Sequence, residues 1–358
     1  FRQAGLTFEL HLDAAWGGYF ASMLRKEKEG AEISAEGLES TPAMTMGDYV
    51  RRQYEAFPHA DSITVDPHKA GYIPYPAGAL CYRNGGQRDL VAFTAPVVYH
   101  GGVDPTVGVY GVEGSKPGAA AAGVYLSHRV IRTDVTGYGQ ILGKCFWNSK
   151  RLYAEVLTLA ERNPDAPFIV RTVQRPPAER QGKSEAEIQK QIDFIGREIV
   201  PRSNAELIEL FRNDEDAWHL FREMGSDQII ITYSFNFKNK DGSVNQDIDL
   251  CNKLNFEVFP QLSLQEFKPK NSGDVPDKPM FVTQSSFSED GYGKDFVEHY
   301  ATRLGLAWQP GASVTFIIST TQDPWVTNTA DGNFIPKLGK VLTDTVTAAV
   351  HKIRGDQA

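Results

Sequence analysis

Short apolar runs mark the predicted strands in the first quarter of the chain. Residues 8–12, 62–65 and 78–82 are rich in apolar or β-branched side chains and are bounded by Gly, Pro or polar residues. We expect the runs at 8–12 and 78–82 to form buried strands, the first of them in a parallel sheet. Residues 25–40 are charged and predict a loop, and residues 46–57 predict a helix.

A long amphipathic pattern covers residues 137–161 and predicts one helix that ends before Pro164 and Pro167. The domain boundary is placed along this helix, with one domain at 1–145 and a second, small α+β domain at 146–358. Predicted strands of the second domain are residues 168–173, 228–235 and 313–318, and its predicted helices are residues 184–194, 205–211, 247–258, 294–304 and 338–351.

Composition narrows the classes of protein that the chain can belong to. It has 358 residues, of which 41% are hydrophobic and 23% charged, as in soluble globular proteins. A formal net charge of -8 argues against a nucleic acid or an anionic membrane surface as partner. Its three cysteines show no paired spacing, which predicts neither a disulfide framework nor a metal site and favours the cytoplasm.

The stretch from Ser62 to Gly78 carries the strongest chemical signal. It begins as a strand, breaks at Pro67 and presents His68 and Lys69 on a turn rich in Gly and Pro. Loops on a rigid scaffold carry reactive groups, and a lysine amine whose pKa is lowered forms a Schiff base with a carbonyl. Lys69 is therefore a candidate nucleophile, and the alternative is an ordinary solvated lysine.

Asp13 stands at the end of the first predicted strand and is followed by small residues. Ligands of open α/β sheets bind at the carboxyl ends of strands. The Asp13 carboxylate would pair there with a cation, and Ala15 would let a flat ring lie close to the backbone. The alternative is that Asp13 caps the N-terminus of a helix.

Residues 112–125 predict a third feature, a helix that begins near Ser115. Ser115 is a good N-cap, Pro117 suits the first turn, and the alanines that follow favour helix. The free N–H groups of a helix N-terminus attract anions, for which a cofactor phosphate is the candidate. The alternative is a capped helix that binds nothing.

These stretches resemble motifs of one enzyme family. Asp66-Pro67-His68-Lys69 with its Gly- and Pro-rich turn resembles the pyridoxal-phosphate lysine motif of the group II amino-acid decarboxylases. Its extension to Tyr75 is most similar to the bacterial tyrosine decarboxylase branch. His11-Leu12-Asp13-Ala14-Ala15-Trp16-Gly17-Gly18 resembles the aspartate motif of the family, and Gly114-Ser115-Lys116-Pro117-Gly118 again resembles the tyrosine decarboxylase branch.

The resemblance implies that pyridoxal phosphate is the cofactor. Lys69 would hold it as a Schiff base, with His68 also on the cofactor side. Asp13 would pair with the protonated ring nitrogen and so preserve the electron sink, and Ala15 would lie against the ring.

Further roles are implied for residues on loops. Residues 89–110 lack periodicity, and the family has a mobile catalytic loop here whose tyrosine protonates the carbanion left by decarboxylation. Tyr99 lies at the matching distance from the lysine, and Tyr75 is its competitor. Gly114 and Ser115 would approach the phosphate held by the other subunit, which implies a homodimer with a shared site. Ser286, where the family has glycine, is the candidate for contact with the substrate.

The resemblance implies an α/β protein of the pyridoxal-phosphate-dependent transferase fold, the aspartate aminotransferase-like fold type I. Residues 1–145 would be the C-terminal half of its large domain. The implied reaction is decarboxylation of an aromatic L-amino acid, such as tyrosine or DOPA, to the amine and CO2. Two alternatives remain: a non-catalytic or partial subunit of a pyridoxal-phosphate enzyme, and a pyridoxal-phosphate lyase that cleaves a carbon–carbon bond.

In the family, a histidine that stacks on the cofactor and the main phosphate-binding loop precede the aspartate motif. Neither is identified in this sequence, because His11 and His59 do not match the stacking position. We therefore expect the chain to be the C-terminal part of a longer polypeptide. It would need its N-terminal portion, or a partner polypeptide, to hold the cofactor.

Overall fold

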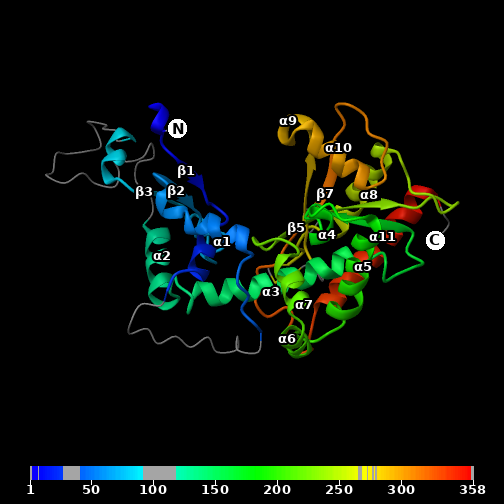
Figure 1. The fold of residues 1–358 in the computed structure, drawn as a ribbon, viewed down its shortest axis with the longest axis horizontal. Helices are drawn as coiled ribbons and strands as arrows, with labels where there is room; N and C mark the ends of the chain where they lie inside the picture. The colour runs from blue at the N-terminus through cyan, green and yellow to red at the C-terminus, as the bar shows by residue number, and fades with distance from the viewer. Residues whose placement is uncertain are drawn as a thin grey trace. The chain divides into compact units, whose positions relative to one another are not determined.

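The computed structural model describes residues 2–6, 8–26, 41–91, 118–264, 268–271, 273–275, 278 and 280–355 of the chain (Figure 1). It is a mixed α/β structure with two sheets. The chain divides into two compact units: unit 1 comprises Phe1–Gly37 and Met46–Gly143, and unit 2 comprises Leu38–Thr45 and Lys144–Ala358.

Unit 1 contains a three-stranded sheet in the order β1 (His11–Asp13), β2 (Ser62–Val65), β3 (Ala79–Tyr82). β1 is parallel to β2, with Asp13 opposite Thr64, and β3 is antiparallel to β2. Among the residues described, the α-helices that belong wholly to this unit are α1 (Asp48–Glu55) and α2 (Ala119–Val130), and the 3₁₀ segments are η1 (Arg2–Ala4), η2 (Gly18–Met23), η3 (Phe57–His59) and η4 (Gly85–Val91).

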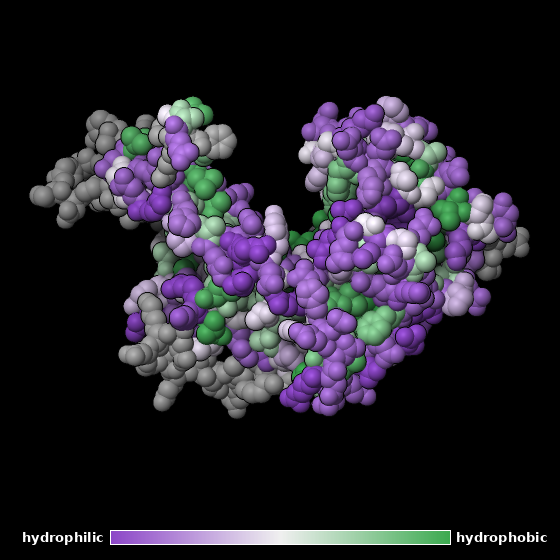
Figure 2. Space-filling view, viewed as in Figure 1, coloured by the Kyte–Doolittle hydropathy of each residue, from purple (hydrophilic) through white to green (hydrophobic). Residues whose placement is uncertain are grey.

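The expected burial of the strands at 8–12 and 78–82 is wrong for the structure as described. β1 and β3 are mostly exposed, and the side chains of Leu10 and Leu80 are 44% and 52% exposed. Both strands lie at the edges of the three-stranded sheet, and no other described strand pairs with their outer sides. Figure 2 shows hydrophobic residues at the surface where β1 lies.

The buried side chains of unit 1 gather instead around η2 and the turn that follows β2. They are Ala14, Tyr19, Phe20, Tyr54, Ala70, Ile73, Ala77, Tyr138 and Leu142, among others. The segment that carries His68 and Lys69 is therefore built into the packed part of unit 1.

Unit 2 contains an antiparallel sheet in the order β4 (Phe168–Thr172), β5 (Ile230–Phe237), β7 (Val314–Thr320), β6 (Thr283–Phe287). The three predicted strands are confirmed within a few residues. β6 was not predicted, because its sequence, Thr-Gln-Ser-Ser-Phe, is polar and lies at an edge of the sheet.

Helix α3 (Tyr138–Leu157) confirms the predicted long helix, and the chain passes from unit 1 to unit 2 within it. The other helices of unit 2 are α4 (Pro177–Arg180), α5 (Glu185–Phe194), the π-helical η6 (Ile195–Ile199), α6 (Asn204–Asn213), α7 (Glu215–Glu223), α8 (Ile248–Gln261), α9 (Glu289–Tyr292), α10 (Lys294–Arg303) and α11 (Ile335–Arg354). Capping boxes at Ser184 and Ser203 start α5 and α6.

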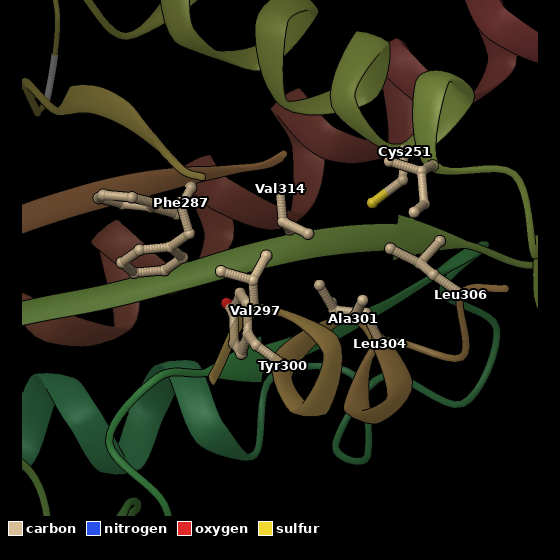
Figure 3. Close-up of a cluster of buried hydrophobic side chains, with 10 residues drawn as sticks. Cys251, Phe287, Val297, Tyr300, Ala301, Leu304, Leu306 and Val314 are labelled. Atoms are coloured by element: carbon tan, nitrogen blue, oxygen red, sulfur yellow. The ribbon is translucent and has the colours of Figure 1, made fainter. Parts of the chain in front are cut away.

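The core of unit 2 forms where helices cover its sheet. α8 packs against β5 and β7, and α11 packs against α8. Figure 3 shows one buried cluster, in which Val297 and Ala301 of α10 point toward the strands. Phe287 of β6 stacks on Phe316 of β7 with ring centroids 3.9 Å apart. The face of unit 2 seen in Figure 2 is mostly hydrophilic.

None of the helices in the described ranges combines the length and the apolar character needed to cross a membrane.

Candidate active site

The candidate site lies where two parallel strands end. Asp13 is the last residue of β1, and the Lys69 turn begins directly after β2. Because the strands are parallel and Asp13 is opposite Thr64, both segments leave the sheet at the same edge. Two backbone hydrogen bonds join these segments, from Ala14 N to Thr64 O at 3.0 Å and from Asp66 N to Ala15 O at 3.1 Å.

Lys69 is fixed by its own turn. Its backbone N–H donates to Asp66 O at 3.0 Å, and its ammonium nitrogen lies 2.9 Å from Asp66 Oδ2. The side chain is 34% exposed, so the amine is held by a carboxylate and still reaches solvent. Asp66 was not singled out from the sequence as a site residue, although an aspartate three residues before the lysine on a turn was a usable signal.

His68 and Tyr75 lie on the same turn as Lys69, and their rings contact each other. His68 Nδ1 donates to the carbonyl oxygen of Ala77 at 2.6 Å, and its ring lies 3.8 Å from the Tyr75 ring, centroid to centroid. Tyr75 is 75% exposed, and the peptide bond that joins it to Pro76 is cis. The fold therefore places an accessible tyrosine on the turn that carries Lys69.

Asp13 bends the chain at the end of β1. Its Oδ1 accepts a hydrogen bond from Ala15 N at 3.1 Å, an Asx turn. The helix-capping alternative is wrong, because the helix that follows, η2, begins after Gly17 and has no side-chain cap.

His11, two residues before Asp13, joins the two strands. Its Nδ1 lies 2.8 Å from Ser62 Oγ and its Nε2 lies 3.2 Å from Thr64 Oγ1. Side chains alternate along a strand, so His11 and Asp13 share one face of β1. His11 thus helps to fix the pairing that sets Asp13 beside β2.

An aromatic cluster of Tyr19, His128 and Tyr138 packs against the Lys69 turn at Gly71. The hydroxyl of Tyr138 donates to Gly71 O at 2.8 Å, and the hydroxyl of Tyr19 lies 2.9 Å from His128 Nε2. Burial raises the pKa of both tyrosines and lowers that of His128. The hydroxyls therefore stay protonated and the imidazole is mostly neutral at neutral pH, and Tyr19 and His128 share one hydrogen bond.

Gly71 is the point at which this cluster meets the turn. A Cβ at this position would lie 2.6 Å from both Pro67 O and Tyr19 Cζ. We expect Gly71→Ala to lower the free energy of unfolding of unit 1 by about 2 kcal/mol, as overpacked sites do. Urea unfolding checks this, with Gly85→Ala as the control because a Cβ there has no neighbour within 4 Å. Equal effects in the two variants would show that the turn relaxes freely.

The roles of the remaining predicted site residues are not tested by the structure. Tyr99, Gly114 and Ser115 lie outside the residues that the structure describes, so their roles stay predictions. Ser286 belongs to β6 of unit 2, where its Oγ lies 3.3 Å from Thr315 Oγ1, and its contact with substrate also stays a prediction. Among the described residues, no group of three or more His, Cys, Asp or Glu side chains could hold a metal ion.

The residues at the sheet edge fit pyridoxal phosphate by their chemistry. Lys69 offers a primary amine for the carbonyl carbon of the cofactor, and Asp13 offers a carboxylate for the ring nitrogen. Both come from segments joined by backbone hydrogen bonds, and Ala15 adds only a methyl group beside them.

Comparison with known proteins supports this chemistry. The chain is 26% identical over 348 residues to an L-tyrosine decarboxylase of Enterococcus faecium, covering 94% of this chain and 47% of that protein. Over 163 residues it is 36% identical to an L-tyrosine decarboxylase of Levilactobacillus brevis, covering 42% and 26%. Over 153 residues it is 29% identical to a probable L-tyrosine/L-aspartate decarboxylase of Methanopyrus kandleri, covering 43% and 32%. No family model matches the chain.

These similarities confirm the resemblance to the group II pyridoxal-phosphate-dependent decarboxylases. Within that class, the chain is similar to the bacterial L-tyrosine decarboxylases over nearly its whole length. It covers about half the length of the Enterococcus faecium protein and less of the other two relatives, and it matches the C-terminal part of these proteins.

Proposed function

We propose that this chain forms part of a pyridoxal-phosphate-dependent amino-acid decarboxylase that converts L-tyrosine to tyramine and CO2. The observation that carries the proposal is the position of Lys69 and Asp13 at the same carboxyl edge of β1 and β2. Similarity to L-tyrosine decarboxylases supports the substrate, and the probable L-tyrosine/L-aspartate decarboxylase makes aspartate the main competitor.

Each residue at this edge has a task in the proposed reaction. When bound, the cofactor supplies an electron sink for the electrons released with CO2. Lys69 would hold the cofactor through its ε-amine, and Asp66 keeps that amine oriented by their 2.9 Å ion pair. Asp13 would keep the ring nitrogen protonated, because an adjacent carboxylate favours the charged form of a base.

A tyrosine would return the proton to the substrate carbon. Tyr75 supports this role by its exposure and by its place on the Lys69 turn, where it stacks on His68. Tyr99 is the other candidate and rests on the sequence resemblance. Tyramine formation is measured in Tyr75→Phe and in Tyr99→Phe. The proton donor is the tyrosine whose replacement abolishes tyramine formation while replacement of the other does not.

We also infer the fold type I arrangement and a homodimer in which Gly114 and Ser115 approach the cofactor phosphate of the partner subunit. The mixed α/β structure with two sheets is compatible with that fold.

Amine formation from single amino acids tests the proposed function. The full-length protein, incubated with pyridoxal phosphate, is assayed for amine and CO2 with tyrosine, DOPA, phenylalanine, tryptophan, glutamate and aspartate in turn. We expect tyrosine to give the highest kcat/KM. Reaction of aspartate or glutamate alone would contradict the assignment of an aromatic substrate, and no amine from any of the six would overturn decarboxylation.

A further inference from the structure

A cationic cavity lies in unit 1. It has a volume of about 380 Å³ and is lined by Arg25, His128, Arg129, Arg132, Thr133 and Asp134. Three arginines and one aspartate line it, in a chain whose formal net charge is -8. A concentration of positive charge in an acidic protein favours an anionic ligand.

The Asp134 carboxylate in the cavity already accepts hydrogen bonds from neighbouring residues of the chain. Asp134 Oδ1 accepts hydrogen bonds from the backbone and hydroxyl of Thr136, at 3.0 and 2.7 Å, and its Oδ2 accepts one from Arg132 Nε at 3.0 Å. Burial raises the pKa of Asp134, but these hydrogen bonds outweigh it and hold the pKa below its ordinary value. Asp134 is therefore charged at neutral pH and serves to orient Arg132.

The positive charges of the other two arginines, Arg25 and Arg129, are available to a ligand. Arg25 Nη1 donates to Thr133 Oγ1 at 3.0 Å, and its carbonyl oxygen accepts from Val135 N at 3.1 Å, so the segment is fixed beside the cavity. Neither Arg25 nor Arg129 forms an ion pair with any residue that the structure describes. His128 adds no charge, because burial lowers its pKa.

The wall of the cavity is rigid. Tyr138 N donates to Arg132 O at 2.8 Å, and Gly137 N and Gly139 N both donate to Asp134 O, at 3.1 and 2.9 Å. A Cβ on Gly139 would lie 2.7 Å from Ser22 O, which shows how closely this turn packs on the segment before Arg25. The arginines thus project from a fixed frame, which reduces the entropy lost when a ligand binds.

We propose that this cavity binds a small oxyanion carrying two negative charges, either a phosphate or a dicarboxylate. Guanidinium groups present a planar fork of N–H donors that matches the oxygens of both groups. The site is separate in sequence from the residues proposed for catalysis, and its assignment does not depend on decarboxylation.

Isothermal titration calorimetry of the full-length protein tests the proposal, with inorganic phosphate and succinate as separate titrants. The protein is first saturated with pyridoxal phosphate and the unbound excess is removed, so that the cofactor site cannot take up the titrant and no free cofactor phosphate competes for the cavity. We expect at least one of the two anions to bind at one site per chain, and the one that binds identifies the source of the oxyanion. Succinamide, the uncharged analogue of succinate, should not bind.

Two arginine variants locate the site. Arg129→Ala should weaken binding about tenfold or more, the scale of one charge-assisted hydrogen bond. Arg197→Ala, in η6 of unit 2, removes another exposed arginine and should bind as the unaltered protein does. No binding of either anion, or equal losses in the two variants, would overturn the proposal.

Discussion

Lys69→Arg is expected to abolish amine formation by the full-length protein, with a loss greater than the roughly 10²–10⁴-fold effect of removing a single acid or base. Arginine keeps the positive charge and the ability to pair with Asp66. It cannot be deprotonated in a protein and therefore cannot attack a carbonyl carbon. The substitution thus separates the chemistry of the amine from its charge.

Two measurements check this result. Tyramine formation reports activity, and borohydride reduction followed by peptide mapping reports which lysine holds the cofactor. Lys26→Arg changes an exposed lysine of unit 1 that does not belong to the turn; it is the control and should retain both activity and labelling. Labelling of a lysine other than Lys69 in the unaltered protein would contradict the site assignment.

The main parts of this site follow from local sequence signals. The apolar run before Asp13 and the β-branched run before Asp66 predict two strands, and parallel pairing alone is enough to bring their ends together. Lys69 can be recognised from its neighbours in sequence alone, because it follows a strand directly and lies on a turn rich in Gly and Pro.

The support behind the Lys69 turn could not be predicted in the same way. Tyr19 meets His128, 109 residues later, and Tyr138 meets Gly71, 67 residues earlier. No periodicity connects such positions, because their contact depends on how the elements pack. Tyr19 follows Gly17-Gly18 and Tyr138 follows Gly137, but the residues around each tyrosine do not indicate that both pack against the Lys69 turn.

Burial of the strands was predicted from composition and depends on neighbours that composition does not specify. Leu10 and Leu80 are as apolar as core residues, yet both are exposed at a sheet of three described strands. In unit 2, β6 was missed for the opposite reason. It is polar along most of its length and is held as a strand by its pairing with β7.

The second large effect is expected in unit 2, at a buried ion pair between Lys150 of α3 and Asp227, which lies between α7 and β5. Lys150 Nζ lies 2.9 Å from Asp227 Oδ1, and the side chains are 1% and 10% exposed. The ammonium also donates to the carbonyl oxygens of Arg222 and Met224, at 2.8 and 2.7 Å. Burial lowers the pKa of Lys150 and Asp227 opposes this, so the aspartate stabilises a charge that the surroundings disfavour.

Asp227→Ala should lower the free energy of unfolding of unit 2 by about 3–5 kcal/mol, because it leaves a buried charge uncompensated. Urea unfolding followed by tryptophan fluorescence checks this, since Trp147 and Trp218 both lie in unit 2. Glu209→Ala is the matched control. It breaks an exposed ion pair with Arg212 and should cost no more than about 1 kcal/mol.

A second substitution distinguishes the charge from the packing around it. In Lys150→Met/Asp227→Leu both charges are replaced by apolar groups of similar size, and such replacements are often neutral or stabilising. The double variant should therefore recover most of the stability lost in Asp227→Ala. If it is as unstable as the single variant, the instability of the double variant arises from the carbonyl groups of Arg222 and Met224, because methionine cannot donate to them.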